Sequence, residues 1–428
     1  MRRALWRQGF AVWVWVCAAL AACGPAATPT ATLPPVTPPT AAPPTLSNPI
    51  PTAYPTKPPV TPTLDRLFAT PEGTAQPSLF APVSDADWQV GPADAAVTVI
   101  EYSDFECEYC AAVAGLLRQL RAEFPADLRL VFRHYPLPQH PKARLAAAAA
   151  EAAGAQGAFW EMHDQLFERQ TEWSTLTVEG FRAALVSYAA ELELDAGQFE
   201  ADLDDPATAA RVQAAYETAR DIPLPGAPFL LWNGGLFPDE GLTSHFGLST
   251  LIRLERLKAR QYTAPPPDVI DPFKTYTATL HTAKGEIVIQ LFAEQTPLTV
   301  NNFVFLARAG WYDGVTFHRV ITGFAAQTGD PSGTGYGGPG YVIPDEFVPE
   351  LRYDAAGWVG MSNTGPDTNG SQFFISLTAL PEYNGRYPLF GKVIAGLEVV
   401  EALTPRDPNA EADAPPGDVI TRVTIEEQ

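Results

Sequence analysis

The chain contains one closely spaced pair of cysteines, Cys107 and Cys110, in the stretch EYSDFECEYC. A Cys-x-x-Cys pair can be half of a zinc site, a structural disulfide or a redox-active disulfide. A structural zinc site needs four nitrogen or sulfur ligands, but the sequence has no second Cys-x-x-Cys and its six histidines are scattered. A disulfide that closes so short a loop stabilises a fold by only about 2 kcal/mol. The pair therefore favours redox chemistry over a metal site or a staple.

The position of the pair between a strand and a helix points to the same chemistry. AAVTVIEYS is typical of a buried strand, and CEYCAAVAGLLRQLRAEF has apolar residues at helical spacing. Backbone N–H groups and the dipole at a helix start stabilise a thiolate, so Cys107 is expected to be the exposed nucleophile. Cys110, one turn further, is then the buried resolving thiol. A client thiolate would attack oxidised Cys107, and a second client thiol would release both cysteines reduced.

The first residues predict export. MRRALWRQGF is basic, and the apolar AVWVWVCAAL and the small AACG follow it, as in a secretory signal. The apolar run is shorter than the roughly 20 residues that span a bilayer. LAAC, which ends at Cys23, resembles a bacterial lipobox, and that resemblance implies a lipid on Cys23; an ordinary cleavage nearby or an uncleaved anchor are the alternatives. We expect an extracytoplasmic protein on the bacterial cell membrane, in an oxidising compartment where Cys107 and Cys110 are the only thiols of the mature chain.

Composition divides the 428 residues into parts and limits the partners. The net charge of −21 argues against nucleic acid as a binding partner. We expect the protein to contact the membrane through its lipid anchor alone. A Pro/Thr-rich stretch without apolar periodicity is expected to form a disordered, extended stalk. The expected parts are the signal peptide (1–23), the stalk (24–83), a first globular domain (84–262), a linker (263–272) and a second globular domain (273–428).

The two globular domains differ in pattern. In the first, strands alternate with helices, and a long Ala-rich helical stretch interrupts them, which predicts an α/β layer fold with a helical insertion. The second is rich in Gly and aromatic residues and has short alternating stretches such as GEIVIQLF, which predict an antiparallel barrel or sandwich.

Motifs of the first domain carry a family resemblance. YSDFECEYC, FRHYPLPQHPKARLAAAAAEAAGAQGAFWEMHDQLF and GAPFLLWNG resemble the DsbA-like branch of the thioredoxin superfamily. The resemblance implies a thioredoxin-like fold and a cis-proline, Pro228, that faces the cysteines and lets a client strand pair beside it. A proline that merely starts a strand is the alternative. Glu106 and Glu108 flank Cys107, and two carboxylates are predicted to raise the pKa of its thiol and weaken its oxidising power.

Motifs of the second domain resemble another family. GVTFHRVITGFAAQTGD (314–330) and GMSNTGPDTNGSQFFISL (360–377), with LFGKVIAGLEVVEAL after them, closely resemble a cyclophilin-type peptidyl-prolyl isomerase. This implies an eight-stranded antiparallel β-barrel closed by two helices. Rotation about an X-Pro bond crosses a barrier of roughly 18–20 kcal/mol. The twisted amide nitrogen gains a lone pair, and the resemblance makes Arg319 the fixed donor that stabilises it.

The same resemblance assigns the substrate contacts, and it implies neither a metal nor a cofactor. Phe324 and Phe374 would form the apolar slot for the proline ring. Glu382 stands where vertebrate members carry Trp, which makes cyclosporin binding doubtful. The full set of expected substrate-contacting residues in this domain is Phe324, Ala325, Gln327, Ser362, Asn363, Phe374, Tyr383 and Tyr387.

The leading interpretation is an envelope folding factor that exchanges disulfides in one domain and isomerises prolyl bonds in the other. Its partners would be folding secreted proteins with thiols and X-Pro bonds, and a redox partner that resets the cysteines. A thiol reductase or disulfide isomerase, rather than an oxidase, is the first alternative. A non-catalytic scaffold that binds proline-containing peptides is the second.

Overall fold

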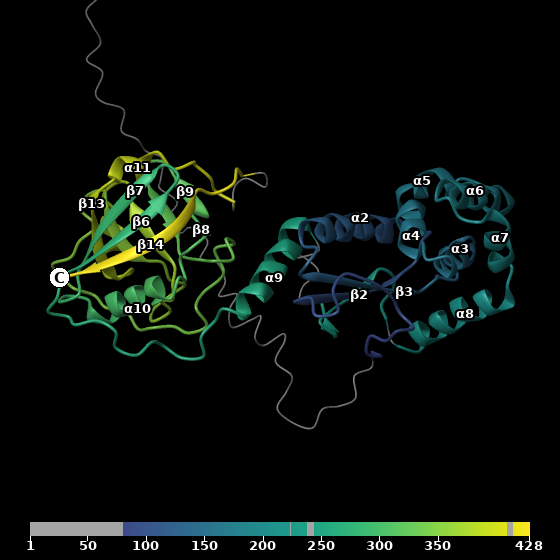
Figure 1. Ribbon diagram of the computed structural model, residues 1–428, viewed down its shortest axis with the longest axis horizontal. Coiled ribbons are helices and arrows are strands. Elements are labelled where there is room, and N and C mark those ends of the chain that lie inside the picture. The colour runs from purple at the N-terminus through teal and green to yellow at the C-terminus, as the bar shows by residue number, and fades with distance from the viewer. Residues whose placement is uncertain (1–79, 223, 238–243, 409–413) are drawn as a thin grey trace, which may run out of the picture. The chain divides into compact units, whose positions relative to one another are not determined.

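The computed structural model describes residues 80–222, 224–237, 244–408 and 414–428. Cys23, the signal segment and most of the expected stalk lie outside the described residues. The described chain contains a five-stranded sheet in its first half and a nine-stranded sheet in its second half (Figure 1). Each sheet has a hydrophobic core of its own.

The first sheet is mixed, with its most buried strand at the centre. β2 pairs in parallel with β3 and antiparallel with β4. Six of the seven residues of β2 are buried, which agrees with the apolar run in the sequence. In hydrogen-bonding order the strands are β1 (Trp88–Val90), β3 (Leu128–His134), β2 (Val97–Ser103), β4 (Phe229–Trp232) and β5 (Gly235–Leu236).

Helices cover both faces of this sheet. α2 (Glu108–Glu123) and α9 (His245–Lys258) pack on the face that carries Val97 and Val99. α8 (Pro206–Asp221) packs on the opposite face, and Figure 1 shows the sheet between α2 and α8. The predicted thioredoxin-like α/β fold is confirmed.

The predicted helical insertion consists of α3 (Ala143–Ala155), α4 (Phe159–Glu168), α5 (Gln170–Trp173), α6 (Val178–Glu191) and α7 (Ala196–Leu203). Its core combines buried alanines of α3 with large side chains of the other helices, among them Trp173 and Phe181. The alanines of α3 leave room for these large side chains, because each contributes only a methyl group to the core.

Two segments at domain edges are packed. Arg133 donates hydrogen bonds to the carbonyls of Ala81 and Pro82, so the first domain already includes residues just ahead of position 84. In the expected linker, the Val269 N–H donates to Asn301 Oδ1 at 2.7 Å. The later part of this linker therefore lies against the second domain.

The second domain is a curled antiparallel sheet of nine strands, ordered β8-β14-β6-β7-β13-β11-β12-β10-β9. Only residues 317–318 separate its two edge strands, β8 and β9, along the chain. The resemblance implied eight strands; the ninth arises because residues 317–318 separate β8 from β9. The strands are β6 (Tyr276–Thr282), β7 (Gly285–Leu291), β8 (Val315–Thr316), β9 (Arg319–Ile321), β10 (Ala325–Thr328), β11 (Trp358–Met361), β12 (Phe373–Ser376), β13 (Leu389–Ala395) and β14 (Val419–Glu427).

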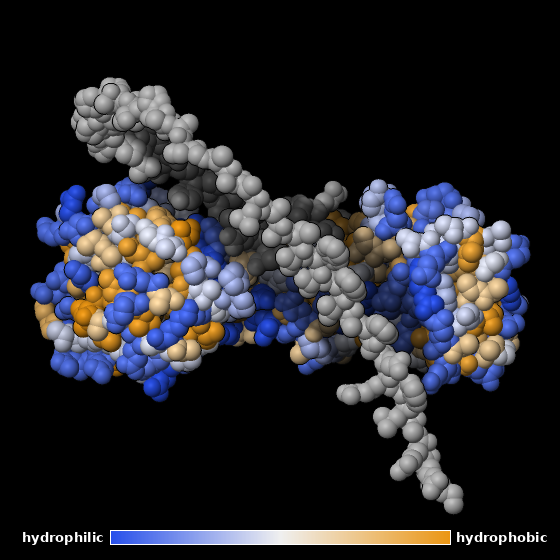
Figure 2. Space-filling model, turned by 90° about the horizontal axis from the view of Figure 1, so that it is seen from above, coloured by the Kyte–Doolittle hydropathy of each residue, from blue (hydrophilic) through white to orange (hydrophobic). Residues whose placement is uncertain are grey.

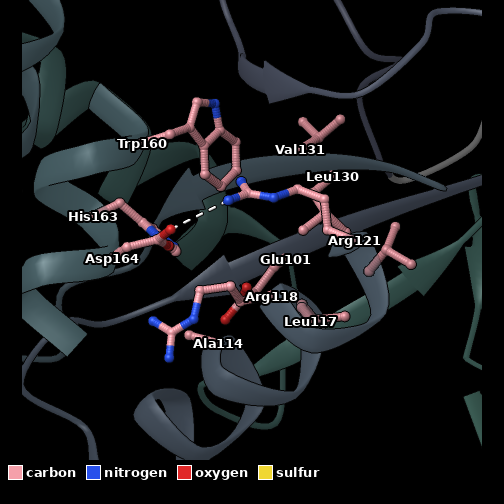
Figure 3. A pocket seen from close by; sticks show the side chains of 11 residues that line it. Glu101, Ala114, Leu117, Arg118, Arg121, Leu130, Val131, Trp160, His163 and Asp164 are labelled. Atoms are coloured by element: carbon pink, nitrogen blue, oxygen red, sulfur yellow. Dashed lines mark hydrogen bonds and ion pairs between the residues drawn. The ribbon is translucent and has the colours of Figure 1, made fainter. Parts of the chain in front are cut away.

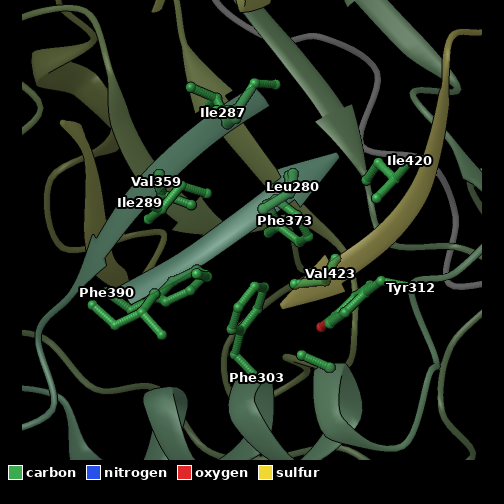
Figure 4. Packing of buried hydrophobic residues seen from close by; sticks show 14 of the residues in the cluster. Leu280, Ile287, Ile289, Phe303, Tyr312, Val359, Phe373, Phe390, Ile420 and Val423 are labelled. Atoms are coloured by element: carbon green, nitrogen blue, oxygen red, sulfur yellow. The ribbon is translucent and has the colours of Figure 1, made fainter. Parts of the chain in front are cut away.

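Two helices complete this domain, α10 (Pro297–Arg308) and α11 (Leu397–Glu401). Phe303 of α10 packs against Phe373 and Phe390, with ring centroids 5.4 Å away in both cases. Figure 4 shows these rings among the aliphatic side chains that the strands direct inward. The inside of the barrel is thus a filled core, so the site residues must lie on its outer face.

In the face shown in Figure 2, hydrophobic areas are interspersed with hydrophilic side chains on both folded segments. Within the described ranges, no helix is both long enough and apolar enough to cross a membrane.

Candidate active sites

Both cysteines lie at the start of α2, where the sequence placed them. Cys107 is the N-cap residue, and Cys110 lies in the first turn. Cys110 is fully buried, as predicted, but Cys107 is only 6% exposed and is therefore less open than predicted. Part of the cover comes from the segment before β4, because Cys107 Sγ lies 3.6 Å from the carbonyl oxygen of Ala227. The Ala227–Pro228 peptide bond is cis, as the resemblance implied.

The electrostatics of the pair separate the two thiols. A hydrogen bond from the Cys110 thiol, aided by the N–H groups of Cys110 and Tyr109, lowers the pKa of Cys107 to about 6. Burial raises the pKa of Cys110 well above its ordinary value, and the hydrogen bond to Cys107 raises it further. Cys107 is thus the thiolate at neutral pH and Cys110 stays protonated, which is the division of roles that the sequence predicted.

The prediction that Glu106 and Glu108 give Cys107 a raised pKa is wrong, because the pKa of this thiol is lowered and neither carboxylate is among its main causes. Glu106 turns away to the backbone N–H of Lys142, which donates to it at 2.6 Å, and to the Lys142 ammonium at 3.5 Å. The carboxylate that does raise the pKa of Cys107 is Asp104, and the hydrogen bonds at the helix start outweigh it. Adjacency in sequence was misleading because a turn before the helix redirects the Glu106 side chain.

Asp104 organises the loop before the cysteines, and the sequence analysis missed it. Its buried carboxylate accepts hydrogen bonds from the N–H of Glu106 (2.7 Å), the N–H of Leu137 (2.7 Å) and His140 Nδ1 (2.8 Å). Gln170 of α5 donates to the carbonyls of Phe105 and Cys107, both at 2.8 Å. The helical insertion therefore helps to hold residues 104–107, which we call the redox loop. The hint in the sequence was an acidic residue at the end of the predicted buried strand, directly before the cysteine pair.

Glu101 is a second missed residue. It lies on the face of β2 that α2 covers, and burial raises the pKa of its carboxyl to about 7. Its charge in turn raises the pKa of Cys110, while Ser103 beside it lowers the pKa values of both groups. Among the described residues, Glu101 Oε1 and Ser103 Oγ are buried and have no hydrogen-bond partner of regular geometry.

A cavity of about 10 Å³ adjoins Glu101 between α2 and α4 (Figure 3). That is about the size that one internal water requires. Trp160 Nε1 and His163 Nε2 near this cavity also lack a hydrogen-bond partner in the described part of the chain. Glu101 therefore lines this cavity and also influences Cys110 electrostatically.

On the barrel, the strand register gathers the catalytic and substrate-contacting residues. Arg319 on β9 is directly opposite Gln327 on β10, and Gln327 is directly opposite Phe374 on β12. Directly opposed residues of antiparallel strands point to the same face of the sheet. The neighbours Ala326 and Phe373 point inward to the barrel core, so the row of Arg319, Gln327 and Phe374 lies on the outer face.

Aromatic side chains surround Phe374 and form the expected slot. The ring of Tyr383 lies 5.5 Å from that of Phe374 and 5.9 Å from that of Phe324, edge to face in both cases. Tyr387 lies 5.8 Å from Phe374, and Ala325 belongs to the same cluster. All five apolar residues expected at the slot therefore come together.

Tyr353 stacks on Phe374 at 5.6 Å and was missed by the sequence analysis. Its hydroxyl occupies the space beside Gly360, where an added Cβ would be 1.7 Å from the oxygen. Gly360 pairs with the slot residue Phe374, and a glycine at such a position was the signal in the sequence that another side chain packs there.

Polar groups border the slot. Gln327 Nε2 donates to Ser362 Oγ at 2.9 Å and to Gln372 Oε1 at 3.0 Å, so its amide is oriented within the protein. The Asn363 side chain donates to Asn369 Oδ1 at 3.0 Å, which fixes the loop that presents the Asn363 backbone. The expected residues Ser362 and Asn363 thus lie at the site, with Asn363 engaged through its side chain in the loop.

Across the described ranges, no three side chains of His, Cys, Asp or Glu lie close enough together to hold a metal ion.

Comparisons with known proteins agree with this geometry. Residues 277–425 match the family "Cyclophilin type peptidyl-prolyl cis-trans isomerase/CLD", and residues 84–245 match the family described as "Thioredoxin". "Peptidyl-prolyl cis-trans isomerase A" of Mycobacterium tuberculosis is 49% identical over 150 residues, covering 31% of this chain and 82% of the relative. "Peptidyl-prolyl cis-trans isomerase-like 3" of Gallus gallus is 47% identical over 151 residues, covering 34% and 94%.

The thioredoxin-like domain places its cysteines at the first turn of α2, and the barrel places an arginine, a glutamine and a phenylalanine in one row beside an aromatic slot. The chain therefore belongs, through its C-terminal domain, to the cyclophilin-type peptidyl-prolyl cis-trans isomerases, and it carries a thioredoxin-like domain ahead of that domain.

Proposed function

We propose that the protein is an extracytoplasmic folding factor that isomerises X-Pro bonds at the Arg319 site and exchanges disulfides at Cys107 and Cys110. The observation that carries the isomerase half is the row of Arg319, Gln327 and Phe374 across β9, β10 and β12. A proline ring in the aromatic slot would place its nitrogen near the guanidinium. The donor then stabilises the lone pair that appears only when the amide twists, which lowers the barrier.

Loss of this donor tests the isomerase half. In Arg319→Ala we expect the rate of peptide isomerisation to fall by more than about tenfold, as for removal of one transition-state donor. Arg422→Ala, on the exposed part of β14, removes an arginine from the same domain and serves as the control. A loss below tenfold in Arg319→Ala, or an equal loss in Arg422→Ala, would contradict the assignment.

The redox half is supported by the divided pKa values of the two thiols. Cys107, with a pKa of about 6, is a stable thiolate at neutral pH and therefore a good leaving group when a second client thiol releases it from the mixed disulfide. When the first client thiolate attacks Cys107, Cys110 leaves as a thiolate that must gain a proton because its pKa is raised, and Glu101, with a pKa of about 7, is the nearby group that can donate it. Glu101 would regain its proton by way of the cavity between α2 and α4.

Disulfide transfer to a reduced, unfolded client tests the redox half. The oxidised protein should form disulfides in the client in a stoichiometric reaction, and Cys107→Ser should abolish it. Cys110→Ser should abolish it too, because the Cys107–Cys110 disulfide cannot form; with a client that already carries a disulfide, the Cys107 thiolate of this variant should form a mixed disulfide that accumulates, because the resolving thiol is missing. Transfer that persists without Cys107 would refute the proposal.

The main alternative for the redox half is a thiol reductase or disulfide isomerase, which differs from an oxidase in the direction of electron flow. A reductase or isomerase would keep the pair reduced, whereas an oxidase would keep it oxidised. We favour the oxidase direction because of the low pKa of Cys107. A low pKa stabilises the thiolate of the reduced form, and a more stable reduced form makes the disulfide a stronger oxidant. Trapping the thiols in the native cell decides the matter, because a mostly reduced pair would exclude the oxidase.

The localisation is proposed from the sequence. The basic n-region, the apolar run and the lipobox-like LAAC support a lipid on Cys23. Cys23→Ala should abolish incorporation of a labelled fatty acid and release the exported protein from the membrane fraction, provided that the lipid is the anchor. Unchanged labelling would refute lipidation at this residue. The DsbA-like affiliation is likewise proposed from the motifs quoted above.

A non-catalytic peptide-binding scaffold is the other candidate. It would bind proline peptides at the slot without accelerating exchange between their isomers. The row that includes Arg319 argues against it, because binding a proline ring requires the aromatic slot but not a cation beside it.

A further inference from the structure

The guanidinium of Arg319 is held by a carboxylate from a distant loop. Arg319 Nε donates to Asp407 Oδ1 at 3.2 Å, and Nη2 donates to Oδ2 at 3.3 Å. The side chain of Arg319 is 22% exposed and that of Asp407 is 24% exposed. Two parallel contacts from one edge of the guanidinium define its orientation, as a single contact would not.

The backbone of the loop is fixed to the strand that carries Arg319. The Arg406 N–H donates to the Val320 carbonyl at 2.9 Å, and the Val320 N–H donates back to the Arg406 carbonyl at 2.8 Å. This bridge aligns residue 406 with residue 320, so Asp407 comes to lie beside Arg319. The carboxylate is therefore delivered by a fixed backbone.

The base of the loop is also closed. The Thr404 N–H donates to Asp418 Oδ2 at 2.6 Å. The Phe317 N–H donates to the Asp418 carbonyl at 2.8 Å, just before β9. Both ends of the loop are thus attached near the catalytic strand.

We propose that Asp407 is a positioning residue for Arg319: it fixes the Nε–Nη2 edge, so that the other side of the guanidinium faces the prolyl nitrogen. A donor that is already oriented stabilises the twisted amide without reorganising during the reaction. This proposal rests on the isomerase function proposed above. A contribution to stability explains the pair less well, because partly exposed ion pairs add little to folding.

The negative charge of Asp407 allows a second interpretation, in which Asp407 hinders catalysis. The substitution Asp407→Asn described below distinguishes the two. A carboxylate on the catalytic arginine could compete with the substrate for its donors. Removing that charge would then make the enzyme faster. Positioning and competition therefore predict changes of opposite sign.

Asp407→Asn is the main test, because it keeps the shape of the side chain and removes its charge. Exchange spectroscopy on an X-Pro peptide gives the isomerisation rate on the enzyme, and titration with the same peptide gives its Kd. We expect the rate to fall by about tenfold, since a small misplacement of a catalytic group has effects of this order or larger. The Kd should change by less than about twofold, because the aromatic slot is intact.

Three further measurements complete the design. Asp407→Glu should recover part of the lost rate, because it restores a carboxylate. Glu398→Gln, an exposed acidic residue of α11, should leave the rate unchanged. In an Arg319→Lys background, Asp407→Asn should lower the isomerisation rate only slightly further. The lysine ammonium is a point charge, whereas the planar guanidinium of arginine needs to be oriented.

The outcomes separate this inference from the proposed function. An unchanged or faster rate in Asp407→Asn, a loss confined to Kd, or fully additive losses with Arg319→Lys would each overturn the positioning role. Thermal unfolding of each variant shows that a lost rate is not a lost fold. If the unmodified protein does not isomerise peptides, the proposed function itself fails; if it does and Asp407→Asn matches it, only the inference fails.

Discussion

Individual residues acquire their chemistry here from hydrogen bonds and burial. The Cys107 thiol gains acidity from donors at the start of α2, and the carboxyl of Glu101 loses acidity because it is buried on β2. The two groups therefore titrate near neutral pH from opposite directions. Charges that are close in sequence matter less, as the turned-away Glu106 shows.

The thiolate of Cys107 can be titrated directly. Its alkylation rate in the reduced protein should follow a midpoint near pH 6, and Cys110→Ala should move the midpoint upward, because the hydrogen bond from Cys110 is the main cause of the low pKa. Since a pKa of 6 lies between those of thioredoxin and DsbA, equilibration with glutathione should give a potential between roughly −270 and −120 mV. A midpoint above pH 8, or a potential at either limit, would disagree.

Glu101 should make stability depend on pH in the oxidised protein, where the thiols do not titrate. Its pKa rises from 4.5 to about 7 on folding, so the folded state binds this proton more tightly. The stability it contributes is present below pH 4.5 and is lost as pH rises through 7, by up to about 3 kcal/mol. Glu101→Gln should abolish this loss. Urea unfolding at pH 4.5 and pH 8 gives the free energy of unfolding of the unmodified protein and of Glu101→Gln. An equal change between the two pH values in both proteins would contradict the prediction.

Elements of the fold position each site through their pairing. Register between β9, β10 and β12 sets the catalytic row, and the start of α2 sets the spacing of the thiols. Packing behind the site is equally specific, because the Tyr353 hydroxyl fills the space that a side chain at position 360 would need. The slot thus depends on the absence of a side chain at Gly360, which leaves room for Tyr353.

Gly360→Ala should disturb the slot. An added Cβ would be 1.7 Å from the Tyr353 oxygen, so Tyr353 and the stacked Phe374 must move. Overpacking of this kind costs about 1–3 kcal/mol, and we expect the isomerisation rate to fall by about tenfold as the slot shifts. Gly338→Ala is the control, since an added Cβ there meets nothing within 4 Å. Equal rates in the two variants would show that Tyr353 does not support the site.

At the scale of the whole molecule, the two sites are built from separate stretches of chain. The hydrogen-bond partners of the redox loop lie between residues 104 and 227, and the row on the barrel uses residues 319 to 374. No described residue is shared between the two sets. The joint purpose proposed above, two slow steps of secreted-protein folding, is inferred from their presence in one chain.

Separate construction predicts separable activities. Cys107→Ser should abolish disulfide transfer and leave peptide isomerisation within about twofold, and Arg319→Ala should do the reverse. Both assays are run on the same full-length preparations, so that each variant is the control for the other. A variant that loses both activities while remaining folded would reveal coupling between the two domains.

The sequence by itself determined the two folds and most site residues, because motifs such as FECEYC and NGSQFF are local and their spacing survives folding. It also predicted which cysteine is the nucleophile, since the start of a helix is a local feature. Tertiary structure alone decided which charges act at the sites. Asp104, Glu101 and Asp407 take their roles from burial and from partners many residues away, and Glu106 loses its expected role for the same reason. Electrostatic effects depend on distance and desolvation, which the sequence does not specify.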